Sequence, residues 1–112
     1  MISVYIYRDK NSSIKKIEMT GHADFGFRGD DIVCASASFL SYTLLNYLIE
    51  VLELDESQLH YEINEELPYF LIEIKNDESA ERAKQGLEFY EIGIVSLVEH
   101  YSDNVDLLYR EV

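Results

Sequence analysis

The order of hydrophobic patterns along the chain predicts an α+β fold, in which a mainly antiparallel sheet of two hairpins packs against two main helices. Two pairs of short segments alternate apolar and polar residues, and a polar turn joins the members of each pair. After each pair, a longer segment repeats its apolar residues every three or four positions, as a helix does. With 112 residues, the chain can build one core but not two. We therefore expect a single domain over residues 1–112.

The first hairpin is expected over residues 2–20. Apolar residues stand at every second position from Ile2 to Ile6, which is the period of a half-buried strand. A polar turn at residues 9–13 leads to a second strand with weaker alternation, and that strand ends just before His22.

The first helix is expected over residues 32–54. One face carries apolar residues at positions 33, 37, 40, 44, 48 and 51, and a second face carries them at 39, 42, 45, 49 and 52. A helix that is apolar on two faces must be covered on both, so we expect one face on the sheet and the other against a second subunit. The alternative is that the tyrosines lie at the surface with their hydroxyls in water.

A second hairpin is expected over residues 59–74, followed by a second helix from residues 76–79 to Tyr101. Gly86 and Gly93 weaken that helix by up to about 1 kcal/mol each, which close packing against another backbone would explain. A short C-terminal strand can follow, over residues 105–109. The order is β-β-α-β-β-α(-β), with the helices on one face of the sheet.

Composition restricts the function. The formal net charge of −13 repels phosphate backbones, so we expect no direct nucleic-acid binding and favour basic partners such as a basic peptide. We find no run of about 18 apolar residues that would span a membrane, and no signal peptide. A cytoplasmic location follows, and there a lone cysteine is an inert or a reactive thiol rather than part of a disulfide.

That cysteine, Cys34, lies near the end of a glycine-punctuated segment of sequence GHADFGFRGDDIVCAS, at positions 21–36. If Asp31 caps the helix, Cys34 falls in the first turn, near unpaired backbone N–H groups that favour a thiolate and can receive an oxyanion. His22 lies twelve positions earlier, and a loop containing Gly26 and Gly29 can fold it back to form a Cys-His dyad.

Structural roles are open for the same residues. Cys34 can be a small core residue, and His22 can simply close a turn. Phe27 can anchor the loop to the core or contact a substrate. We expect no metal site, because the histidines and Cys34 lack the short spacing of metal ligands, and no cofactor is indicated.

The motif Gly21-His22-Ala23, a glycine-bearing loop, then Gly29-x-Asp31-Ile32-Val33-Cys34-Ala35 and Ser38 resembles the signature of the ribosomal-processing cysteine proteases called Prp. The likeness extends over the whole chain, through both hairpins and the late helix. Ser36 stands where alanine is usual, and the loop is more acidic than expected.

The resemblance implies a cysteine endopeptidase that removes a short N-terminal extension from a large-subunit ribosomal protein during ribosome assembly. It implies that Cys34 and His22 are catalytic, that Asp31 and Ser38 support them, and that the loop with Gly26, Phe27 and Gly29 moves to admit the substrate. It also implies a homodimer. Two alternatives are a thiol acyl-transfer hydrolase with another substrate and a non-enzymatic dimeric module that binds basic ribosomal-protein tails.

Overall fold

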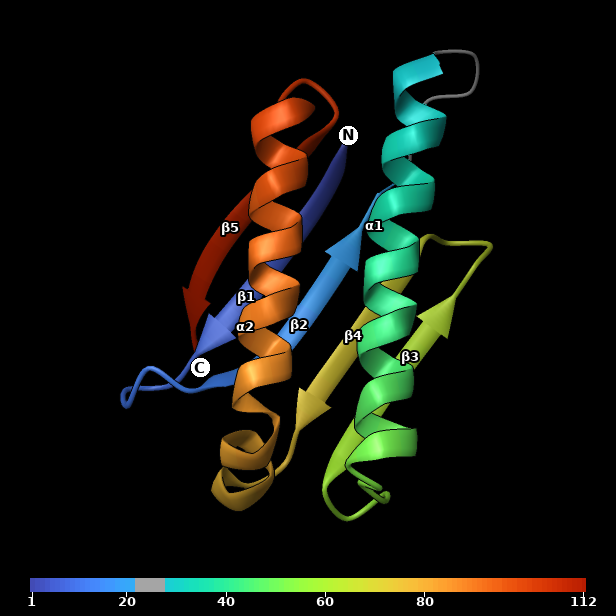
Figure 1. Ribbon diagram of the computed structural model, residues 1–112. Helices are drawn as coiled ribbons and strands as arrows, with labels where there is room; N and C mark the ends of the chain where they lie inside the picture. Colours follow the sequence, from blue (N-terminus) through green and yellow to red (C-terminus); the bar gives the residue numbers. More distant parts are fainter. Residues whose placement is uncertain (22–27) are drawn as a thin grey trace.

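The computed structural model describes residues 1–21 and 28–112, with the backbone alone for residues 28–31. The elements in chain order are β1 (Ile2–Arg8), β2 (Ile14–Thr20), α1 (Arg28–Asn46), the π-helical turn η1 (Tyr47–Val51), β3 (Leu59–Asn64), β4 (Tyr69–Ile74), α2 (Asp77–His100) and β5 (Val105–Glu111). The strands form one sheet in the order β3-β4-β2-β1-β5. Both long helices lie on the same face of this sheet (Figure 1). The predicted α+β class and the order of elements are confirmed.

The sheet is mixed rather than purely antiparallel. The β1–β2 and β3–β4 hairpins have antiparallel register, and β2 joins them by pairing antiparallel with β4. The last strand pairs in parallel with β1, from Ile2 opposite Val105 to Arg8 opposite Glu111. It must do so because β4 runs in the direction of β1 and α2 carries the chain back across the sheet (Figure 1). The C-terminal strand has seven residues and is therefore longer than the short one predicted.

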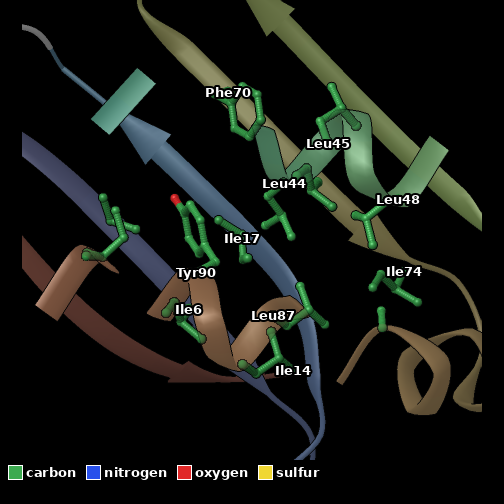
Figure 2. Packing of buried hydrophobic residues seen from close by; sticks show 14 of the residues in the cluster. Ile6, Ile14, Ile17, Leu44, Leu45, Leu48, Phe70, Ile74, Leu87 and Tyr90 are labelled. Carbon is green, nitrogen blue, oxygen red and sulfur yellow. The ribbon is translucent and has the colours of Figure 1, made fainter. Parts of the chain in front are cut away.

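The helices and the sheet enclose one hydrophobic core (Figure 2). Its fully buried side chains come from every layer and include Ile6, Ile17, Leu48, Leu87 and Ile94. Each such side chain contributes about 1.5–3 kcal/mol relative to full exposure. This burial holds α1 and α2 at fixed positions over the strands.

Each of the two apolar faces of the first helical segment, α1 and η1, packs partly against other elements of the same chain. Val33, Ala37 and Leu48 are completely buried on the first face. On the second face, the Tyr42 ring packs edge-on against Phe70, with the ring centroids 5.6 Å apart, whereas Phe39 is 73% exposed. The sheet therefore covers part of the face that we assigned to a second subunit.

The stretch Ile32–Val51 has a mean hydropathy of 1.6, so by length and composition it is long enough to cross a membrane. The expectation that the chain lacks such a run was wrong. Its buried residues nevertheless belong to the core just described, and the core helix of a two-layer fold needs the same composition.

The glycines of α2 make room for side chains, not for backbone as predicted. A Cβ atom added at Gly86 would lie 2.6 Å from Cε2 of Tyr47. One added at Gly93 would lie 3.1 Å from the methyl groups of Leu40. The two helices approach closely because a ring and a leucine occupy the space that these glycines leave open.

Candidate active site

Cys34 on α1 lines a groove whose lining also includes Gly21, the residue after the end of β2. The thiol is half-buried and packs against the hydrophobic core. The groove has a volume of about 310 Å³. Its described lining residues are Ile2, Met19, Gly21, Cys34, Ser38, Tyr42, Ile63, Asn64, Glu65, Pro68, Tyr69 and Phe70. The lone thiol of the chain therefore borders an open groove.

One wall of the groove is a single face of α1. Cys34, Ser38 and Tyr42 are four residues apart, and this spacing puts side chains one above another on a helix. Ser38, which the sequence suggested as a supporting residue, thus lies one turn from Cys34 on the same wall. The aromatic contact between Tyr42 and β4 closes the far end of this wall.

The opposite wall comes from the β3–β4 hairpin, about thirty residues later in the chain. Its contributors are Ile63 and Asn64 at the end of β3, Glu65 in the turn, and residues 68–70 at the start of β4. Sequence reasoning identified this segment only as a hairpin. No local pattern connects a turn to a helix so far away, so the sequence held no signal for this wall.

Gly21 follows the last residue of β2 and lines the groove. Its φ is +83°, and a Cβ atom there would lie 2.4 Å from the carbonyl oxygen of Met1. Its N–H donates to the carbonyl oxygen of Pro68 at 3.3 Å. Only glycine fits this junction. His22, Gly26 and Phe27 lie outside the described residues, so their roles stay predictions.

The start of α1 differs from the prediction. The helix begins at Arg28, so Asp31 is its fourth residue and not its cap, and Gly29 belongs to the first turn instead of the loop. Cys34 is the seventh residue, whereas the unpaired N–H groups belong to the first four. Aspartates in a first turn are stabilised by the helix dipole, and this allows the helix to continue back through Gly29.

A carboxylate on the sheet ties together the strands that carry the groove. Glu18 on β2 accepts hydrogen bonds from Tyr7 on β1 at 3.1 Å and from Tyr69 on β4 at 2.7 Å. Burial, followed by the bond to Glu18, raises the pKa of Tyr69 to about 12. The phenol therefore stays protonated and keeps donating over the whole physiological pH range, which holds the start of β4 against β2.

Volume alone does not select this site. A hollow of about 380 Å³ lies between the β1–β2 turn and α2, and its described lining contains no thiol or imidazole. Among the residues whose side chains are described, no group of three His, Cys, Asp or Glu could hold a metal ion. The position of Cys34 is what distinguishes the groove.

Comparisons with known proteins identify the family of this chain. A family model described as Cysteine protease Prp matches residues 1–106. A Bacillus subtilis protein named ribosomal processing cysteine protease Prp is 32% identical over 108 residues, which cover 94% of each chain. A crystal structure of the essential Prp from S. aureus in complex with a substrate peptide superposes with a TM-score of 0.85, at 26% identity over 98% of this chain and 100% of that one. The same protease with a covalently linked product peptide gives a TM-score of 0.77, at 27% identity and the same coverage.

The fold and the groove with its thiol, taken with these matches, define a cysteine protease. More particularly, the chain belongs to the Prp family, whose relatives are named for ribosomal processing. The resemblance inferred from the motif around Cys34 is confirmed.

Proposed function

We propose that this cysteine protease removes a short N-terminal extension from a large-subunit ribosomal protein in the cytoplasm, with Cys34 as nucleophile and His22 as general base. The observation that carries the proposal is that the only cysteine of the chain lines a groove of about 310 Å³. The S. aureus relative, which has the same fold, is known with both a substrate peptide and a covalently linked product peptide.

Formation of the acyl-enzyme requires two proton transfers, and its hydrolysis requires two more. His22 takes the thiol proton while the Cys34 sulfur attacks the scissile carbonyl carbon, which forms a C–S bond. The tetrahedral intermediate then collapses, the C–N bond breaks, and the imidazolium gives its proton to the leaving amine. Water deprotonated by His22 attacks the thioester, releases the carboxylate product and restores the thiol.

The groove suits an apolar segment of peptide. Ile2, Met19 and Phe70 contribute apolar surface, and Ser38 and Asn64 offer polar groups for the peptide backbone. A pocket of mainly apolar walls with a few polar groups is the usual form of a specific binding site. The net charge of −13 steers a basic ribosomal-protein tail towards the enzyme.

A homodimer through the outer face of the helices completes the proposal. Phe39 on α1 is 73% exposed, and Phe89 on α2 is 75% exposed. They border one apolar hollow of about 440 Å³ between the two helices. Exposed apolar patches of this kind mark interaction surfaces. Sedimentation should give twice the chain mass for the wild type and the 13.0 kDa monomer for a Phe39→Ser, Phe89→Ser variant; a monomeric wild type would contradict the dimer.

The activity is tested by incubating the protein with a large-subunit ribosomal protein that carries its N-terminal extension and by identifying the products by mass spectrometry. We expect one internal cut with the wild type and none with Cys34→Ala or His22→Ala. His60→Ala and His100→Ala are matched controls, because these exposed histidines lie on β3 and α2 away from the groove lining. They should cleave at the wild-type rate. Full activity of Cys34→Ala or His22→Ala would refute the dyad.

A further inference from the structure

We propose that Glu65 in the β3–β4 turn selects a cationic substrate residue near the scissile bond. This inference rests on the proposed peptidase function and names what the groove recognises. Of the described residues that line the groove, Glu65 is the one with a formal charge at neutral pH. The other described lining residues are apolar or neutral, so among them Glu65 is the source of a negative potential on this wall.

The Glu65 carboxylate is available for an intermolecular contact. Its residue is exposed at the rim. The ion pairs of the described side chains join Arg8 to Glu91, Lys15 to Asp77 and His60 to Glu62, and none of them uses Glu65. A carboxylate without an internal partner can pair with a ligand at no cost in broken contacts.

The turn that carries Glu65 is held in place on both sides. The Asn64 side-chain oxygen accepts the N–H groups of Glu66 and Leu67, each at 3.0 Å, which is an Asx-type turn. On the other side, the carbonyl oxygen of Pro68 accepts the N–H of Gly21. The backbone of Glu65 therefore has a defined position relative to the wall that holds Cys34.

Glu65 and Cys34 line the same groove. An extended peptide advances about 3.3 Å per residue, so a peptide whose carbonyl lies at the Cys34 sulfur can bring a nearby side chain to Glu65. Lysine or arginine at that position would be attracted, and aspartate or glutamate would be repelled.

Glu66 is an internal control for this assignment. It follows Glu65 in the same turn, carries the same charge and is exposed, but it does not line the groove. A general effect of negative charge would depend equally on both residues. Selection within the groove would depend on Glu65 alone.

The test uses peptides that span the junction between the extension and the mature ribosomal protein, with Lys, Gln or Glu placed in turn at each position near the cut. For wild-type enzyme at low salt, we expect kcat/KM to favour Lys over Glu at one position by roughly threefold to thirtyfold, since each exposed charge contact is weak. The preference should shrink as salt rises, because about 0.1 M salt screens charges beyond about 10 Å.

Charge reversal gives the decisive comparison. Glu65→Lys should invert the order at that position, Glu65→Gln should abolish it, and Glu66→Lys should keep the wild-type order. If Glu65→Lys keeps the wild-type preference, or if Glu66→Lys inverts it equally, the assignment to Glu65 is overturned.

Binding separates this inference from the proposed function. Equilibrium binding of the same fluorescently labelled peptides to Cys34→Ala, with and without Glu65→Lys, measures the charge preference when no bond is cut. Failure of the wild type to cleave would refute the peptidase proposal, and the binding order would still decide the role of Glu65. Equal affinities for Lys and Glu peptides in both backgrounds would overturn that role.

Discussion

A buried pair of hydroxyl groups joins the two helices, and substituting each in turn should show which hydroxyl donates the hydrogen bond. Ser41 on α1 is fully buried, and Tyr90 on α2 is 2% exposed. Their oxygens lie 2.9 Å apart, and Ser41 Oγ also donates to the carbonyl oxygen of Ala37 at 2.8 Å. Because the serine has one proton and gives it to Ala37, the Tyr90 hydroxyl donates to Ser41.

This direction makes the two single substitutions unequal. Tyr90→Phe removes the donor and leaves Ser41 bonded to Ala37, so unfolding free energy should fall by about 1 kcal/mol. Ser41→Ala leaves the Tyr90 hydroxyl buried without that acceptor, which should cost about 2–3 kcal/mol. The double variant carries neither group, so it should be no less stable than Ser41→Ala and closer to Tyr90→Phe.

Urea unfolding followed by circular dichroism measures all three variants. We expect a coupling free energy of about 1.5–3 kcal/mol in the double-mutant cycle, with unchanged m-values that show an unchanged unfolded state. Strictly additive effects, or a Tyr90→Phe variant less stable than Ser41→Ala, would refute the assigned direction of the hydrogen bond.

Three further predictions concern the same helices. Burial raises the pKa of Tyr90 to about 12 from 10. The contribution of the Tyr90 hydroxyl to the free energy of unfolding is therefore complete below about pH 10 and is lost as the pH rises towards 12. In urea titrations across this interval, the higher stability of the wild type relative to Tyr90→Phe should shrink and then reverse. Gly86→Ala gains up to about 1 kcal/mol of helix propensity but places a Cβ atom 2.6 Å from the Tyr47 ring. Thermal unfolding should therefore show a net loss of stability of about 1 kcal/mol. In a Tyr47→Ala background, the same Gly86→Ala substitution should increase stability. Asn76→Ala removes the cap that accepts the N–H of Ser79 at 2.8 Å and should lower stability by about 1 kcal/mol, whereas Asn76→Asp should retain it; equal losses would contradict a capping role.

Local periodicity was enough to predict the elements of this chain. Alternation in residues 2–7 and the repeat in residues 80–101 follow from the geometry of strands and helices and need no distant partner. The same holds for Asn76, which stands where a helix cap is expected and accepts the N–H of Ser79. The motif around Cys34 is also local, which is why it identified the family before any contact was known.

Two opposing features of the sequence explain why the predicted start of α1 was wrong. Gly26 and Gly29 indicated a loop up to Asp31, yet α1 already begins at Arg28. The cost of one glycine in a first turn is up to about 1 kcal/mol, which two acidic residues at the positive end of a helix can offset. The cost of the glycine and the stabilisation by the acidic residues are of similar size, and sequence spacing alone could not decide which is larger. The predicted position of Cys34 in the helix was therefore wrong by one turn.

The sequence by itself thus determined the element order and the family, because each depends on residues close together in the chain. Only the tertiary structure decided that β5 pairs in parallel with β1, that Tyr47 occupies the space beside Gly86, and that the β3–β4 turn forms the wall opposite Cys34. These features depend on contacts between distant segments, and such contacts are set by how the whole core packs and not by any local pattern.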